Sequence, residues 1–402
     1  SDLQIVRDLA KQAMELTQSD EYERRRRRWR DVNELRTPDR APVWCRPVGC
    51  WKEILPPESL NCRSDELRQW EYAFRQTLHK HDIGDDEPLE PYFTVNAVYD
   101  VEPSNTWGVE IGKHLSKEDG GSWGYDPPLK TPADFETLAA PTYTFNETRT
   151  RENLARAEEL LGEILPVKVH YGPGFDSGTL GTAAADLRGL EQIMIDMITE
   201  PDLMHRLMAH LRDAKMRQLD AMEATGLLTP NNTGAMLCSD PVGGEPADEK
   251  YTLKNCWCAG NSQEFDQVSP AMWEEFLLNY QKPIFERFGY VCYGCCENLT
   301  HKIDGVLSIP NLRIFVCSAW TSLDVVLERI ETDYCIMWRQ KAGDVVMPHE
   351  TATIRRDLEE GLKRLQGRRY QIVLRELQTL YGHPDRLHAW TDIAKELAAK
   401  YA

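Results

Sequence analysis

Two cysteines and a glutamate stand together at one point of the chain and could carry chemistry. Cys295, Cys296 and Glu297 end a short apolar run that begins at Tyr290. An amphipathic stretch from Pro270 to Phe288 comes first, so the pattern predicts a helix and then a strand with the ligand atoms at its carboxyl tip. Thiolates with a carboxylate are a ligand mix typical of zinc. The alternative is that the cysteines are small buried hydrophobes.

Polar side chains also follow other predicted strands. Asp240 follows a strand predicted near residues 233–238, and it is a candidate for substrate binding or proton transfer, or else a turn residue. Arg339 could pair with a substrate carboxylate through its planar fork, or form a structural salt bridge. The Cys256-x-Cys258 pair is more typical of turn thiols than of a site. The other candidates at strand ends are substrate-binding residues: His170, Tyr171, Trp320 and Glu376.

The elements that must position these residues alternate along the chain. From about residue 150, strands are predicted at 167–171, 233–238, 290–293, 312–317, 334–338 and 370–374, with helical stretches between them. Alternation of this kind indicates a parallel sheet. We therefore expect an α/β fold, a (β/α)8 TIM-type barrel over residues 37–402, with its site at the carboxyl ends of the strands. Residues 1–36 form a predicted N-terminal helical extension. Residues of about 52–135 form an irregular insertion with a strand at 93–99.

Composition excludes several classes of partner. The chain has 402 residues and a net charge of -18, which disfavours nucleic acid and anionic membranes. The basic run from Arg24 to Arg28 favours a solvated helix face or a contact in a homodimer. We expect no membrane span and no signal peptide. Eleven cysteines, an odd number without the spacing of a disulfide framework, indicate a reducing cytoplasm with free or metal-bound thiols.

Three segments carry a resemblance to a known superfamily. Residues 37–51 read TPDRAPVWCRPVGCW and resemble the first-strand signature of uroporphyrinogen decarboxylases. Residues 181–208 look like a helix pair of the wider superfamily, which includes corrinoid- and coenzyme M-dependent methyltransferases. Residues 268–299 resemble an uncharacterised decarboxylase-like branch. The resemblance implies a barrel whose site includes Arg46 as a carboxylate anchor and Glu264, in a barrel loop, as a ligand or general base. For Glu264, a helix-capping carboxylate is the alternative.

The chain departs from both branches of that superfamily. Uroporphyrinogen decarboxylases carry a second arginine where this chain has Cys50, and their aspartate after the second strand is matched only by Asn96 and Asp100 in another context. With the charge of -18, this argues against a porphyrinogen substrate. The methyltransferases have a His-x-Cys zinc pair in which Cys295 matches the cysteine. The histidine and a distant third cysteine are missing, so the remaining zinc ligands would come from among Cys296, Glu297, His301 and Cys317.

These features leave three hypotheses. The first is a zinc-dependent methyltransferase that moves a methyl group from a small methylated, even methoxylated, substrate to a corrinoid on a separate partner protein. Zinc would act as a Lewis acid on the substrate. The second is a cofactor-independent decarboxylase or related lyase that acts on a small carboxylic acid other than uroporphyrinogen. The third is a barrel that only binds ligands. Polar residues at so many strand ends argue against the third.

Overall fold

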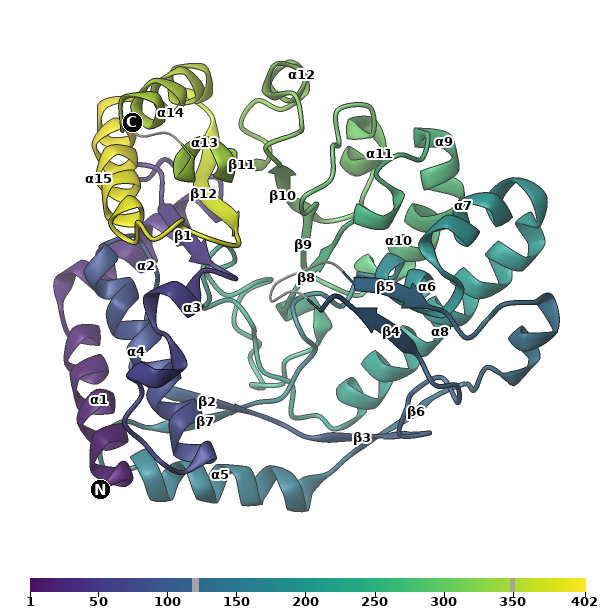
Figure 1. Ribbon diagram of the computed structural model, residues 1–402, viewed down its shortest axis with the longest axis horizontal. Coiled ribbons are helices and arrows are strands. Elements are labelled where there is room, and N and C mark those ends of the chain that lie inside the picture. Colours follow the sequence, from purple (N-terminus) through teal and green to yellow (C-terminus); the bar gives the residue numbers. More distant parts are fainter. Residues whose placement is uncertain (118–122, 348–350) are drawn as a thin grey trace.

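The main sheet of the protein is parallel and curled. A computed structural model describes residues 1–117, 123–347 and 351–402. Six strands lie in the order β1-β12-β11-β10-β9-β8, so the last strand of the chain pairs with the first. Figure 1 shows this sheet curling as half of a barrel, with helices along its outer side. The strands are β1 (Val43–Pro47), β8 (Trp257–Gly260), β9 (Tyr290–Tyr293), β10 (Leu312–Cys317), β11 (Cys335–Arg339) and β12 (Arg369–Leu377).

Two more parallel strands form a separate pair, β2 (Phe93–Asn96) and β7 (Val167–His170). Beside β1, the Asp86 carboxylate accepts from the Val43 N–H at 2.8 Å, and the Asp86 N–H donates to the Val43 carbonyl at 2.7 Å. Beside β8, the Ala259 N–H donates to the Phe175 carbonyl, after β7, at 2.7 Å. The predicted α/β class is confirmed. In the described residues the main-chain ladders form a half-barrel and a separate pair, not a closed ring of eight.

The remaining elements surround these sheets. Two antiparallel pairs lie in and just after the insertion, β3 (Tyr99–Glu102) with β6 (Thr142–Phe145) and β4 (Gly112–Leu115) with β5 (Trp123–Asp126). None of the described helices combines the length and apolarity needed to cross a membrane. The helices are α1 (Asp2–Thr17), α2 (Asp20–Asn33), α3 (Trp51–Ile54), α4 (Asp65–Ile83), α5 (Glu147–Leu161), α6 (Gly181–Arg188), α7 (Leu190–Thr199), α8 (Pro201–Ala224), α9 (Pro270–Trp273), α10 (Asn279–Phe285), α11 (Ile303–Leu307), α12 (Leu323–Arg329), α13 (Ala342–Val346), α14 (Thr351–Leu365) and α15 (Asp385–Lys400).

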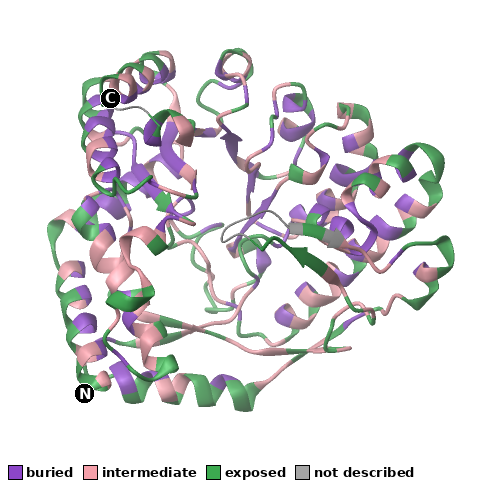
Figure 2. Ribbon diagram, viewed as in Figure 1, coloured by how far each residue is buried: buried purple, intermediate pink, exposed green. Residues whose placement is uncertain are grey.

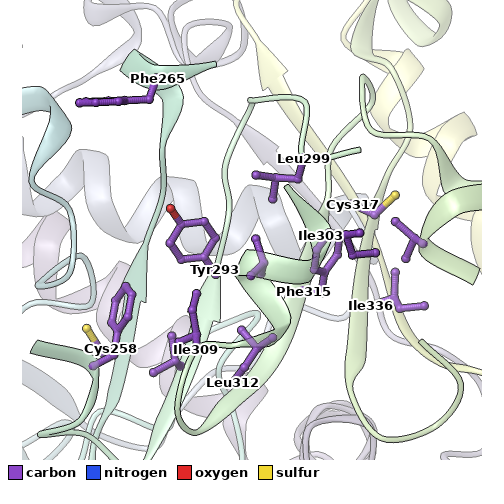
Figure 3. Close-up of a cluster of buried hydrophobic side chains, with 14 of the residues drawn as sticks. Cys258, Phe265, Tyr293, Leu299, Ile303, Ile309, Leu312, Phe315, Cys317 and Ile336 are labelled. Atoms are coloured by element: carbon purple, nitrogen blue, oxygen red, sulfur yellow. The ribbon is translucent and has the colours of Figure 1, made fainter. Parts of the chain in front are cut away.

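The six-stranded sheet is covered on both faces, because successive residues of a strand point to opposite sides. Cys292, Ile314 and Met337 belong to the apolar cluster on the inner face. Their neighbours along the strands, such as Phe315 and Ile336, pack outward against helices. Figure 3 shows part of this outer layer. In Figure 2 the strands are buried, and the surrounding helices are exposed on the faces that point away from the sheet. Burial on both faces explains the nearly continuous apolar runs in the sequence.

Some predicted elements differ from those observed. The strand predicted at 233–238 is wrong, because that segment is a loop whose carbonyls at Met236 and Cys238 accept from the Asn33 side chain at 2.9 and 2.8 Å. Its place in the sheet is taken by β8. The N-terminal extension is two helices, with the second beginning after Ser19. The insertion predicted as irregular contains the 19-residue helix α4, and residues 118–122 of it lie outside the described part.

Candidate functional site

A short loop directly after β9 carries the two adjacent thiols. Gly294 turns the chain there with a φ of 117°, a conformation that L side chains rarely adopt. A Cβ on this residue would lie 2.8 Å from the Cβ of Val316 in β10. The Sγ atoms of Cys295 and Cys296 are 3.6 Å apart, and Cys296 Sγ donates to Glu376 Oε1 at 3.1 Å. The loop therefore places both thiols beside the carboxyl end of β12.

The Glu297 side chain holds this loop in place through hydrogen bonds. It is buried, and Oε1 accepts from the Ser262 N–H at 2.7 Å and from the Ser262 hydroxyl at 3.2 Å. Oε2 accepts from the Cys295 N–H at 2.8 Å. Burial raises the pKa of this carboxyl above its usual value, against the effect of those donors. Because both oxygens are engaged in this way, Glu297 holds the thiol loop in position.

Arg339, at the end of β11, ties the loop to β12. Its side chain is 1% exposed, and Nη1 donates to Glu376 Oε1 at 2.9 Å and to the Cys295 carbonyl at 2.7 Å. Glu376 is one-third exposed and has a φ of 61°, in the left-handed region. A non-glycine residue held in that region is often found at a functional site. The structure thus brings together five of the predicted site residues: Cys295, Cys296, Glu297, Arg339 and Glu376.

The two thiols differ in acidity. The single hydrogen of the Cys296 thiol is shared between Glu376 Oε1 at 3.1 Å and Cys295 Sγ at 3.6 Å, and this hydrogen bond, aided by the positive charges of Arg339 and Arg375, lowers the pKa of Cys295 to about 6 against the cost of burial. The pKa of Cys296 is raised, first by its hydrogen bond to Cys295, then by burial and by the negative charge of Glu376. Cys295 is therefore the thiolate and Cys296 the protonated thiol near neutral pH. A nucleophile and a proton donor stand side by side.

Three arginines lie on the inner face at neighbouring strand ends, and we call Arg46, Arg339 and Arg375 the arginine rim. In the ladder Arg339 of β11 pairs with Val373 of β12, and Arg375 follows Val373 by two residues, where the register with β1 shifts. The charges of both Arg339 and Arg46 act on Arg375, so the three guanidinium groups lie near one another. Trp44 of β1 also pairs with Val373, and Arg46 lies two residues beyond Trp44. Burial, and then repulsion from Arg339, lowers the pKa of Arg375. In the described residues, the side chains of Arg46 and Arg375 make no hydrogen bond or ion pair.

Sequence reasoning did not predict Arg375. The signal that could have found it was its position one residue before Glu376, at the end of the strand paired with the strand of Arg46. Beside Arg46, between β1 and α4, lies a cavity of about 270 Å³ that is lined by Trp44, Trp51 and Lys80 among others. Its size suits a small molecule.

In the described part of the chain, none of the other predicted residues is hydrogen-bonded to Cys295 or Cys296. Trp320 is 59% exposed, with Lys341 Nζ 4.9 Å from the centre of its ring. Glu264 accepts from the Thr182 hydroxyl at 2.7 Å through one oxygen, while the other oxygen is buried without a partner in the described residues. Asp240 pairs with Arg36 at 2.7 Å. Because Arg36 precedes β1, Asp240 sits at the opposite, amino end of the strands.

His170 and Tyr171 belong to the separate strand pair. His170 Nδ1 lies 2.8 Å from the Thr229 hydroxyl, and burial lowers the pKa of the imidazole. The Tyr171 N–H donates to the same hydroxyl at 2.9 Å. His170 lines a cleft of about 570 Å³ with Asn96. Of the remaining candidates, Cys50, Cys256, Cys258 and Cys317 are buried, Asp100 is exposed and accepts from Asn146, and His301 is exposed.

The predicted zinc ligands Cys295, Cys296 and Glu297 do not converge, because Glu297 is committed to the loop. Across residues 1–117, 123–347 and 351–402, no three His, Cys, Asp or Glu side chains form a group suited to a metal ion. Cys295, Cys296 and Glu376 are the donors in contact, and their chemistry suits zinc. They would have to rearrange to surround an ion.

No protein-family model matches the chain, and a search of the curated proteins found no match either. The argument for function therefore rests on the site itself.

Proposed function

We propose that this chain is an enzyme that acts on a small carboxylic acid as a decarboxylase or a related lyase, without a cofactor. The observation that carries the proposal is the arginine rim beside a thiolate and a protonated thiol. A guanidinium binds a carboxylate through two parallel hydrogen bonds. Arg339 is already paired with Glu376, so Arg46 and Arg375 provide the positive charge for a substrate.

The rim suits a carboxylate that stays on the substrate better than one that leaves. Two guanidinium groups on a departing carboxylate would stabilise the charge that must be lost, and would therefore slow the reaction. Held instead on a second carboxylate, Arg46 and Arg375 fix the substrate's position while carbon dioxide leaves elsewhere. The proposal thus favours acids with at least two carboxylates.

The thiol pair can supply the proton that such a reaction needs. Loss of carbon dioxide leaves the electron pair of the broken bond on the substrate carbon, which must take up a proton. Cys296 is a protonated thiol at the rim, whereas Cys295 is already a thiolate. In our proposal Cys296 gives its proton to the carbon, and water then returns a proton to its sulfur. Glu376, which accepts from Cys296 at 3.1 Å, positions that thiol.

The surroundings favour a small substrate. The cavity of about 270 Å³ beside Arg46 offers aromatic walls from Trp44 and Trp51, while the buried amine of Lys80 in its lining is already paired with Asp85. We further propose that β2 and β7 complete an eight-stranded barrel with the six-stranded sheet, so that the rim and the cleft at His170 face one central space. A barrel of this kind carries its site at the carboxyl ends of its strands.

Calorimetric titration with succinate and butyrate, which differ by one carboxylate, tests the anchor. Succinate should bind more tightly, and Arg46→Gln or Arg375→Gln should weaken it by about tenfold or more, since a charged hydrogen bond contributes about 1.5–3 kcal/mol. Arg355→Gln, which removes an exposed arginine far from the rim, is the matched control. Succinate binding that both rim variants leave unchanged would contradict the proposal. Carboxyl-labelled dicarboxylic acids then test for release of labelled carbon dioxide.

A zinc-dependent methyltransferase, with the corrinoid on a separate protein, is the second candidate. The contacts of Cys296 with both Cys295 and Glu376 favour it, because these three donors could hold the ion. Zinc would supply Lewis acidity toward a methylated substrate. Elemental analysis of protein purified without chelator should then give one zinc per chain, lost in a folded Cys295→Ser protein and kept in Cys62→Ser, whose thiol lies elsewhere. Full zinc content in Cys295→Ser would place the ligands elsewhere.

A further inference from the structure

Cys295 and Cys296 differ from every other cysteine of the chain in accessibility. The remaining cysteines are buried, whereas these two are partly exposed. Their Sγ atoms are 3.6 Å apart, in neighbouring residues of one loop. Two accessible thiols this close can react with each other as well as with a substrate.

The loop also keeps the pair in place. The Cys295 N–H donates to Glu297 and the Cys295 carbonyl accepts from Arg339, so the main chain of Cys295 is held from both sides. Cys296 is held through its thiol, which donates to Glu376. Neither sulfur needs to travel far to meet the other.

We propose that Cys295 and Cys296 form a reversible dithiol–disulfide couple that turns the site off when it is oxidised by hydrogen peroxide. The Cys295 sulfur attacks a peroxide oxygen, the O–O bond breaks, and hydroxide leaves, which gives a sulfenic acid on Cys295. The Cys296 sulfur then attacks that sulfur, the S–O bond breaks, and water leaves as the S–S bond forms. Two thiols lose two protons and two electrons in total, and one peroxide becomes two molecules of water.

The disulfide is expected to be reversible because its two residues are neighbours. Their Cα atoms are held about 3.8 Å apart by a trans peptide bond. An ordinary disulfide spans about 4.4–6.8 Å between Cα atoms, so this one closes under strain and is readily reduced. In the disulfide, Cys296 no longer carries a proton and Cys295 is no longer a thiolate. Arg339 and Glu376 keep their ion pair. The arginine rim survives, and the thiol chemistry is lost.

Mass spectrometry of the protein treated with one equivalent of hydrogen peroxide tests the couple without any substrate, so its outcome is independent of the proposed reaction. The wild-type protein should lose two hydrogen atoms, all within the peptide that holds residues 295 and 296. The count of free thiols in denaturant should fall from eleven to nine, and dithiothreitol should restore it. Cys62→Ser should behave as the wild type does, starting from one thiol fewer.

Cys295→Ser and Cys296→Ser should each lose the two-hydrogen change and instead gain oxygen on the remaining thiol. Should either variant not fold, the peptide map of the wild-type protein decides alone. A wild-type product with oxygen added and no linkage between the two sulfurs overturns the proposal. A disulfide that involves any other cysteine overturns it as well.

Discussion

Cys295 should react with iodoacetamide as a thiolate at unusually low pH. Its pKa of about 6 lies below the ordinary value of 9.0. At about pH 5.5 roughly one-quarter of such thiols are ionised, against about one in three thousand ordinary ones. Nucleophilicity falls with pKa, with a Brønsted slope of about 0.4–0.5, which costs about fifteen- to thirtyfold over this shift. The net expectation is alkylation about 25–50 times faster than that of an ordinary thiol.

The assay follows alkylation of the peptide that holds Cys295 from about pH 5 to pH 9, with fragmentation to separate it from Cys296. The rate should fall as pH drops through about 6, because the proton then returns to the sulfur. Cys296→Ala removes the hydrogen bond that lowers the pKa most, so the midpoint should move upward. The buried cysteines serve as internal controls that label slowly. A wild-type midpoint near 9, or one that Cys296→Ala leaves unmoved, would refute the reasoning.

Four further outcomes can be checked. Arg339→Met should lower the free energy of unfolding in urea by about 1–3 kcal/mol because the Cys295 carbonyl and Glu376 lose their donor, whereas Arg355→Met, in an exposed pair, should cost less than about 1 kcal/mol. Gly294→Ala should destabilise by about 1–3 kcal/mol, while Gly343→Ala, with nothing near its added Cβ, should not. The Glu71 carboxyl is buried, which opposes ionisation, yet the N–H groups of Cys62 and Asn61 hold its pKa at about 2; its contribution to stability is therefore present above about pH 4.5 and lost as pH falls toward 2, unlike in Glu71→Gln. Incubation with uroporphyrinogen should yield no coproporphyrinogen by chromatography, because Cys50 replaces an arginine.

Much of the site could be predicted because it lies where apolar runs end. Cys295, Arg339 and Glu376 each follow or close such a run, and the structure brings them into contact. Arg375 was missed because it lies within a strand, where its inward direction depends on the register with β1 and β11. Asp240 follows a segment that looked like a strand, yet it faces the other end of the sheet beside Arg36. Sequence position alone does not say which end of a sheet a loop reaches.

Most strands of the main sheet could also be predicted from the sequence, whereas one strand and one helix could not. The strands from β9 to β12 stand out because both of their faces are buried, which makes them continuously apolar. The strand β8 was missed because the cysteines at positions 256 and 258 suggested a turn, although they are buried there as small hydrophobes. The helix α4 was missed because its apolar positions are few, with only Phe74 and Ile83 as buried hydrophobic residues.

The junction of β1 with the segment before β2 has a consequence for anyone who would redesign this protein. Beside β1, the buried carboxylate of Asp86 accepts a hydrogen bond from the Val43 N–H. The same carboxylate forms ion pairs with the guanidinium groups of Arg28 and Arg40. Those two arginines come from the N-terminal segment, so trimming that segment would leave a buried anion uncompensated. The first forty residues therefore stabilise β1, and a shortened version of this protein would have to keep Arg28 and Arg40.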